Sequence, residues 1–189
     1  NECKSLANIR FPSTITSISN GTFSNCVSLV HFEIPNCINS IGNYAFNYCL
    51  SLKQIVIPSS VTSIGDYAFN CCSSLEQIYI PYSVVSIGKY AFKKCSKLKR
   101  MRIPSSITSI KEGTFYYCTS LSHIIIPTSV ISIDDFAFSG CKSLGQLQIP
   151  PSLVSIGRNV FNDYSSYIID YQGYNSFSLY NKLSYCLII

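Results

Sequence analysis

The residues most suited to chemistry in this sequence are two histidines and ten cysteines. Imidazole nitrogens transfer protons near neutral pH and bind metals, and thiolates are nucleophiles and metal ligands. His31 and His123 lie far apart in the sequence, and neither belongs to a nucleophile–base pattern. The vicinal pair Cys71-Cys72 has no second pair that would complete a four-thiolate zinc site. The sequence therefore predicts no catalytic residues and no metal site.

Acidic residues and phosphate-binding motifs lead to the same expectation. Asp134 and Asp135 are adjacent, so their side chains would point in different directions from a helical turn, and a chance pair is favoured over a catalytic dyad. The sequence contains no glycine-rich phosphate loop, zincin helix or nucleophile elbow. We therefore expect a protein that is not an enzyme and that uses no cofactor.

A run of basic residues is the main charge feature. Half of the 14 Lys and Arg residues fall between positions 89 and 102, with no acidic residue among them. Two interpretations stay open: a solvated edge, or a docking patch for an acidic partner such as a sulfated glycan, an anionic lipid headgroup or an acidic protein. Nucleic acid is not expected, because no nucleic-acid-binding fold accompanies the run. This basic patch consists of Lys89, Lys93, Lys94, Lys97, Lys99, Arg100 and Arg102.

An internal repeat must position all of these residues. Seven prolines, at positions 12, 35, 58, 81, 104, 127 and 150, follow one another at intervals of 23 residues. Seven cysteines keep the same interval, at positions 3, 26, 49, 72, 95, 118 and 141. A period of this length indicates a solenoid, in which each unit buries its apolar face by stacking on its neighbours.

Each repeat reads as a strand, an irregular connection and a short helical segment. Residues 75–80 have the alternation of a strand with one buried face, and Pro81 ends that strand because it lacks a backbone donor. Residues 66–72 are expected to form one or two helical turns. The predicted fold is an α/β solenoid with a parallel, concave β-sheet and short helical turns on the convex side. Its core is a ladder of Phe23, Phe46, Phe69, Phe92, Phe115, Phe138 and Phe161.

The repeat resembles a known family. The segment Leu75-Glu76-Gln77-Ile78-Tyr79-Ile80 fits the L-x-x-L-x-L core of leucine-rich repeats. With Pro81, Ile87-Gly88, Ala91-Phe92 and Cys95, it resembles the BspA-like leucine-rich repeats of surface proteins from oral bacteria and from anaerobic protists such as Trichomonas and Entamoeba. The resemblance covers about residues 3–164. It implies a right-handed superhelix and a cell-surface or secreted adhesion or interaction protein without catalytic residues.

The repeat also predicts the domain organisation. Residues 1–164 form one solenoid of seven units that begins within a repeat, and residues 165–189 contain a degenerate repeat. We expect this last segment to be a C-terminal cap, with a stalk leading to a membrane anchor as the alternative. The sequence contains no apolar run long enough to be a transmembrane helix.

The cysteine ladder is expected to consist of buried free thiols, which behave as small hydrophobic side chains. Disulfides between adjacent turns are the alternative, since strand spacing falls within the usual Cα separation of a disulfide. Cys37, Cys71 and Cys186 lie off the ladder. Many free thiols would suit a reducing compartment and so favour a cytoplasmic location over a surface one.

The predicted binding surface is the outward face of the concave sheet. Its side chains change from repeat to repeat, whereas the inward ladders hardly change. Tyr79, Arg100 and Arg102 are of types enriched in interface hot spots, and with Tyr82 they form the predicted centre. Asn20, in Asn20-Gly21-Thr22, is a candidate N-glycosylation site. The predicted face consists of Asn8, Arg10, His31, Glu33, Gln54, Val56, Gln77, Tyr79, Tyr82, Arg100, Arg102, His123, Ile125, Gln146 and Gln148.

Three functions fit these observations. The first is a noncatalytic adhesion module at the cell surface that binds a host protein, a matrix protein or a glycan. The second is an intracellular scaffold for protein–protein interaction that uses the same face. The third is an accessory domain that recruits substrate for an enzyme encoded elsewhere in the gene. The sequence favours the first and does not predict the oligomeric state.

Overall fold

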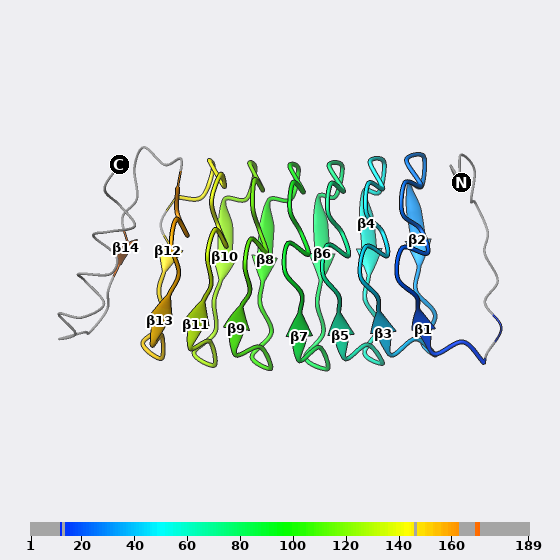
Figure 1. Cartoon of the computed structure of the whole chain (residues 1–189), viewed down its shortest axis with the longest axis horizontal. Coiled ribbons are helices and arrows are strands. Elements are labelled where there is room, and N and C mark those ends of the chain that lie inside the picture. The colour runs from blue at the N-terminus through cyan, green and yellow to red at the C-terminus, as the bar shows by residue number, and fades with distance from the viewer. Residues whose placement is uncertain (1–11, 13, 146, 163–168, 171–189) are drawn as a thin grey trace.

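The structure is a computed structural model that describes residues 12, 14–145, 147–162 and 169–170. Successive coils of the chain stand in a row, and each coil carries a longer and a shorter strand on different sides (Figure 1). Strands pair in parallel with the equivalent strands of the neighbouring coils. The parallel-strand solenoid predicted from the 23-residue repeat is therefore confirmed.

The longer strands form the first ladder. Register partners are equivalent residues of neighbouring repeats, such as His31 beside Gln54 and Gln54 beside Gln77. Each of these strands ends two residues before the repeat proline, as expected because proline lacks the backbone N–H that strand pairing requires. The strands are β2 (His31–Glu33), β4 (Gln54–Val56), β6 (Gln77–Tyr79), β8 (Arg100–Arg102), β10 (His123–Ile125) and β12 (Leu147–Gln148). Strand hydrogen bonding is interrupted between β6 and β8 and between β10 and β12, although these strands remain neighbours in the row.

A second ladder occupies the stretch that the sequence predicted to be an irregular connection. Its isoleucines face inward, and each forms a two-residue strand with the preceding serine. The strands are β1 (Ser17–Ile18), β3 (Ser40–Ile41), β5 (Ser63–Ile64), β7 (Ser86–Ile87), β9 (Ser109–Ile110), β11 (Ser132–Ile133) and β13 (Ser155–Ile156). Strand hydrogen bonding is interrupted between β7 and β9.

The short helical turns predicted for the far side of each repeat are not confirmed. No helix occurs among the described residues, and residues 66–72 form consecutive turns instead. The reason is local: Tyr67 and Cys71 have φ of 55° and 59°, in the left-handed region that interrupts an α-helix. Equivalent positions in the other repeats, for example Tyr44 and Lys94, also have positive φ. Without a bulky helical side, the two sides of each coil are not expected to splay, and a concave sheet is no longer predicted.

The phenylalanine ladder runs through the core as predicted. Phe69 is fully buried and stacks between Phe46 and Phe92, with ring centroids 5.2 and 5.5 Å away and nearly parallel planes. The same stacking continues to Phe23 at one end and to Phe161 at the other. Equivalent side chains of consecutive coils therefore stack directly on one another, as in other solenoid proteins.

The cysteine ladder consists of free, buried thiols among the described residues. The Cys95 thiol donates a hydrogen bond to the carbonyl of Phe69 (3.2 Å), and the Cys72 thiol bonds that of Phe46 (3.1 Å). Burial raises the pKa of the Cys95 thiol above its usual value. Each thiol thus satisfies a carbonyl of the preceding repeat in a dry environment, and the alternative of adjacent-turn disulfides is wrong for this part of the chain.

Side-chain oxygens also link neighbouring repeats along the short-strand ladder. The Asn43 Oδ1 accepts from the backbone N–H of Asp66 (2.8 Å), and the Asp66 Oδ1 accepts from that of Lys89 (2.7 Å). Gly65 lies against this contact: a Cβ on it would stand 2.6 Å from the backbone nitrogen of Asn43. Close approach of two backbones, rather than positive φ, therefore explains the recurring glycine.

In most of the repeats, a serine stands two residues after the proline and forms a similar hydrogen bond between neighbouring coils. Its hydroxyl donates to the carbonyl of a buried residue in the preceding repeat, as from Ser83 to Val61 (2.7 Å). The same bond is made by Ser60, Ser106, Ser129 and Ser152.

The solenoid continues into the segment predicted to be degenerate. β14 (Ile169–Asp170) pairs in parallel with β12, with Leu147 beside Ile169. This register is one residue short of the 23-residue repeat, in keeping with the loss of the pattern in the sequence. The predicted C-terminal cap and the start within a repeat otherwise lie outside the described residues.

Candidate binding surface

The outward side chains of the longer strands form two parallel columns, which we call the long-strand face. Residues at the two ends of each three-residue strand are exposed, while the middle residue turns toward the core. The register places Val56 beside Tyr79 and Arg102 beside Ile125. Among the predicted face residues, Asn8, Arg10 and Gln146 lie outside the described residues. The columns read His31, Gln54, Gln77, Arg100 and His123, and then Glu33, Val56, Tyr79, Arg102, Ile125 and Gln148.

Large apolar side chains are exposed on this face. Val56, Tyr79 and Ile125 keep 68%, 60% and 61% of their surface accessible to solvent. Tyr82 is also exposed, on the turn after Pro81. Strand pairing requires only that alternate residues face inward, so no rule of the fold demands these apolar residues outside. The face is therefore apolar at β4 and β6, where Val56 and Tyr79 are exposed, and positively charged at β8, which carries two arginines.

The two histidines do not form a joint site. His31 lies on β2 and His123 on β10, with three strands of the ladder between them. The His123 Nδ1 lies 2.9 Å from the Ser122 hydroxyl, which itself donates to the carbonyl of Lys99 (3.2 Å). The contact joins His123 to its own neighbour in the sequence and brings it no closer to His31.

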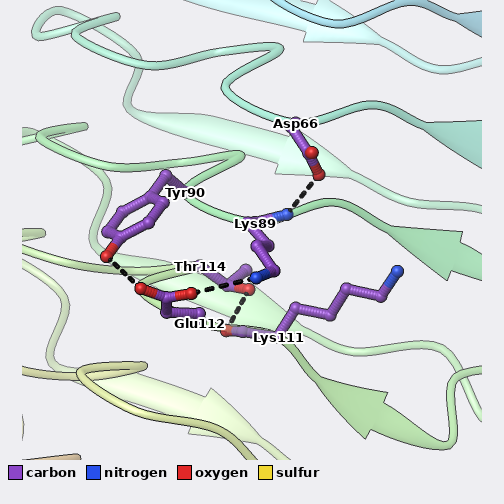
Figure 2. Close-up of polar contacts among 6 residues, drawn as sticks. All are labelled: Asp66, Lys89, Tyr90, Lys111, Glu112 and Thr114. Carbon is purple, nitrogen blue, oxygen red and sulfur yellow. Dashed lines mark hydrogen bonds and ion pairs between the residues drawn. The ribbon is translucent and has the colours of Figure 1, made fainter.

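The basic patch is spread around the coil rather than gathered on one face. Lys89 forms a salt bridge with Glu112 of the next repeat, with 3.1 Å between Nζ and Oε2, and the Tyr90 hydroxyl donates to the other carboxylate oxygen at 2.7 Å (Figure 2). These two hydrogen bonds, from Tyr90 first and from Lys89 second, lower the pKa of the Glu112 carboxyl. Lys93 lies over the rings of Tyr90 and Tyr116, 5.3 and 5.5 Å from their centroids.

Six of the seven residues of the predicted patch are exposed to solvent, and Lys93 is partly buried. Of these, only Arg100 and Arg102 lie on the long-strand face, where Arg100 is the register neighbour of His123. Lys99 precedes them, and Lys94 and Lys97 lie on the turns before the strand. A ligand on the face would meet the two arginines, whereas Lys89 and Lys93 mainly join neighbouring repeats.

The adjacent carboxylates stand on the other side of the coil. The Asp135 Oδ1 accepts from the backbone N–H of Arg158 (2.7 Å), so it belongs to the column of side chains that link repeats. Asp134, Asp135, Glu112 and Lys89 line part of an open depression of about 330 Å³. Among the described residues, no group of three or more His, Cys, Asp or Glu side chains is arranged to hold a metal ion.

Asn20, the candidate glycosylation site, is exposed on the turn side. Its Oδ1 accepts from the backbone N–H of Asn43 (2.8 Å), which leaves the amide nitrogen directed away from that bond. Glycosylation at Asn20 remains a prediction.

Sequence reasoning missed one surface feature, a stack of tyrosines on the turn side. The rings of Tyr44, Tyr67 and Tyr90 lie 4.9 and 5.0 Å apart with nearly parallel planes. Their 23-residue spacing was the available signal, but it was interpreted only as part of the helical segment.

Comparison with known proteins supports this architecture. The sequence profile described as "BspA type Leucine rich repeat region" matches residues 1–84 and 62–186, in six copies. The chain belongs to the BspA-type leucine-rich repeat family. No curated protein matches the chain significantly.

Solved structures of three bacterial leucine-rich repeat proteins resemble this BspA-type chain. A leucine-rich cell surface protein from Faecalibacterium prausnitzii is 35% identical, with a TM-score of 0.77, over 87% of this chain and 45% of that one. The Treponema pallidum leucine-rich repeat protein is 34% identical, with a TM-score of 0.74, over 79% and 72%. One from Eubacterium ventriosum is 30% identical, with a TM-score of 0.60, over 78% and 45%. The BspA-type chain thus spans less than half of the first and third proteins.

The BspA-type repeats of this chain build an extended scaffold. Repeat proteins of this kind present extended surfaces for other molecules and are generally not catalysts. The part of the chain that the structure describes contains no helix with the length and apolar character needed to cross a bilayer.

Proposed function

We propose that this chain is a noncatalytic interaction module that binds an extended segment of a partner protein across the long-strand face. The observation that carries the proposal is the contrast between a constant frame and changing outward residues. Core positions repeat the same residue types in every coil, whereas the two outward columns change at each strand. Val56 and Tyr79 are exposed apolar side chains on this constant scaffold, and such side chains lower solubility unless a partner covers them. We therefore interpret them as contacts to a partner.

The chemistry of the face favours a particular kind of segment. Val56 and Tyr79 are register neighbours and offer an apolar surface, and Arg100 and Arg102 follow on the next strand. A segment that crosses the strands would place an apolar side chain at β4 and β6 and an acidic one at β8. The arginines could bind a carboxylate or a sulfate in a bidentate manner, so an acidic glycan is the second ligand class.

We propose that this module acts at the cell surface. The support is its 35% identity to the F. prausnitzii protein, which is described as a leucine-rich cell surface protein. An intracellular scaffold is the second candidate, because six buried ladder thiols are free. Protease shaving or surface biotinylation of intact source cells distinguishes the two: modification of the chain without lysis supports a surface location, and protection until lysis supports the scaffold.

The face is tested by capture of partners from extracts of cells and matrix on the folded chain. Arg100→Glu with Arg102→Glu should abolish capture without lowering the melting temperature, since both side chains are exposed. The matched control is Lys94→Glu with Lys142→Glu, which gives the same change in net charge on exposed residues outside the face. Equal losses in both double variants would show that general charge, and not the long-strand face, is responsible. Binding that is insensitive to ionic strength and to the arginines would refute the arginine contacts.

A further inference from the structure

One junction in the row of coils differs from every other junction between described coils. Between the coil of β6 and β7 and the coil of β8 and β9, strand pairing is lost on both strand sides, and we call this junction the central seam. Between β10 and β12 pairing is lost on one side only, because β11 and β13 still pair. In Figure 1, β9 stands farther from β7 than neighbouring short strands stand from each other elsewhere in the row.

The backbone bonds missing on the short-strand side can be named from the repeat. The backbone N–H groups of Val85 and Gly88 donate to carbonyls of the preceding coil at 2.9 and 2.8 Å. The equivalent groups across the central seam belong to Thr108 and Lys111, and neither donates to another described residue. The pattern resumes one coil later, where the Ile131 N–H donates to the preceding coil at 2.8 Å. The interruption is therefore confined to one junction of this ladder.

The amino-acid sequence changes at the same place. A Cβ built on Gly88 would stand 2.4 Å from the backbone nitrogen of Asp66, so glycine allows these two coils to approach closely. Lys111 occupies the equivalent position in the next coil and carries a Cβ. Asp134 follows it, also without glycine, and its N–H still bonds the preceding coil at 2.8 Å. The central seam is the one described junction at which a coil with glycine is followed by a coil without it.

The side-chain link between coils is also missing at the central seam. Asn43 and Asp66 each accept, through a side-chain oxygen, from the backbone N–H that lies 23 residues later. Lys89 comes next in this column, and its ammonium group has no acceptor. Its only contact of this kind across the seam is the salt bridge to Glu112, at 3.1 Å between two long and partly exposed side chains (Figure 2). Long side chains can follow a change in separation that a backbone bond cannot.

The turn side stays closed across the central seam. The backbone N–H groups of Tyr90, Phe92 and Lys94 donate to carbonyls of the next coil at 2.9, 2.9 and 2.7 Å. Phe92 and Phe115 remain stacked, with centroids 5.7 Å apart and planes inclined by 7°. The two coils are therefore joined along one side and unpaired along the other two. This is the arrangement of a hinge whose axis follows the turn side.

We propose that the central seam is a hinge about which the described coils before Arg100 and those from Arg100 onward move as two bodies. Opening breaks no strand pairing, since the N–H groups of Thr108 and Lys111 are already without a protein acceptor. The motion changes the distance between Tyr79 on one body and Arg102 on the other. It thus adjusts the apolar part of the long-strand face relative to its positively charged part; this last consequence rests on the proposed function.

Two NMR measurements on the folded chain test the hinge without any ligand. In amide hydrogen exchange, Thr108 and Lys111 should exchange about 100-fold faster or more than Val85 and Gly88, their equivalents at a paired junction. Residual dipolar couplings then separate motion from a fixed gap. Alignment tensors fitted separately to the two bodies should differ in magnitude, because relative motion averages their couplings unequally, and hinge motions are fast enough for this averaging.

A double variant is designed to close the central seam. Lys111→Gly with Asp134→Gly extends the glycine series through every described coil from Gly42 to Gly157 and leaves the net charge unchanged. It should slow exchange at positions 108 and 111 to within about tenfold of Val85 and Gly88, and it should give both bodies the same alignment tensor.

The matched control is Glu76→Gly with Lys142→Gly, which introduces two glycines with the same charge balance at exposed positions outside the glycine series. It should behave as the wild type. Equal exchange rates at the seam and at the paired junction, or one common tensor for both bodies of the wild type, would overturn the hinge. These wild-type results decide the matter even where the closing variant fails to fold. Because no partner is added, failure to capture a partner on the long-strand face would leave them unchanged.

Discussion

Replacement of Phe69 by alanine is the most direct test of the stacked core. Phe69 is fully buried in the middle of the ladder, and both faces of its ring are covered, by Phe46 at 5.2 Å and by Phe92 at 5.5 Å. Burial of a phenylalanine side chain contributes about 1.5–3 kcal/mol. Each stacked aromatic pair adds about 0.5–1.5 kcal/mol. Their sum agrees with the loss of about 3–5 kcal/mol measured for buried Phe→Ala replacements in general.

Urea unfolding followed by circular dichroism measures this loss in the free energy of unfolding. The control is Tyr79→Ala, which removes an aromatic ring of similar size from an exposed position and should change stability by no more than about 0.5 kcal/mol. A loss of less than about 1 kcal/mol for Phe69→Ala would refute the stacked core, since it would mean that no cavity is created. A changed urea dependence with two separate transitions would show instead that the solenoid has split into two cooperative units.

Three further outcomes follow from the contacts described. Glu112 has a lowered pKa in the folded chain, so its stabilising effect is present above the pKa of the unfolded state and is lost as pH falls through the folded-state pKa. The melting temperature should therefore fall slightly across this acidic range, and Glu112→Gln should remove that part of the pH dependence. Lys94→Gly should leave stability unchanged or raise it by up to about 1 kcal/mol in urea unfolding, because relief of the left-handed conformation offsets the entropy of glycine; a clear loss would argue against φ of 59°. Without reductant, the native chain should leave ladder thiols such as Cys95 unreactive toward a thiol reagent, and their reaction should follow the unfolding curve; rapid native labelling of all thiols would contradict their burial.

The repetitive part of the fold was predictable because seven copies of one pattern average out local ambiguity. The inward positions, the phenylalanine ladder and the parallel pairing all follow from a 23-residue period, since only stacked coils bring equivalent residues together. The free thiols followed from the same reasoning, because a ladder cysteine has equal neighbours on both sides.

The turn side was predicted incorrectly for a specific reason. The composition of residues 66–72 permits a helix, and nothing in the types of Tyr67 or Cys71 indicates positive φ, which is uncommon for such residues. The repeat context overrides this preference: the Tyr67 backbone N–H bonds the Lys89 carbonyl of the next coil instead of a carbonyl in its own segment. Glycine at the equivalent positions 21, 113 and 140, and asparagine at 25 and 159, were the available signals.

The candidate surfaces were predicted unevenly for a related reason. Outward positions of a strand can be counted from its period, so the described members of the long-strand face were named in advance. The positions of side chains on irregular turns cannot be counted in this way. As a result, the salt bridge between Lys89 and Glu112 and the stack of Tyr44, Tyr67 and Tyr90 became visible only in the structure.

The side-chain bonds between coils have a consequence for how such genes change in length. Excision of residues 66–88 would bring Lys89 into the place of Asp66, where its backbone N–H meets the same Asn43 oxygen. The Cys95 thiol would likewise find the carbonyl of Phe46 in place of that of Phe69. Unequal recombination that removes one whole repeat therefore leaves neither of these hydrogen-bond donors without an acceptor at the junction. Such a protein can lengthen or shorten its reach while every remaining coil keeps an equivalent neighbour.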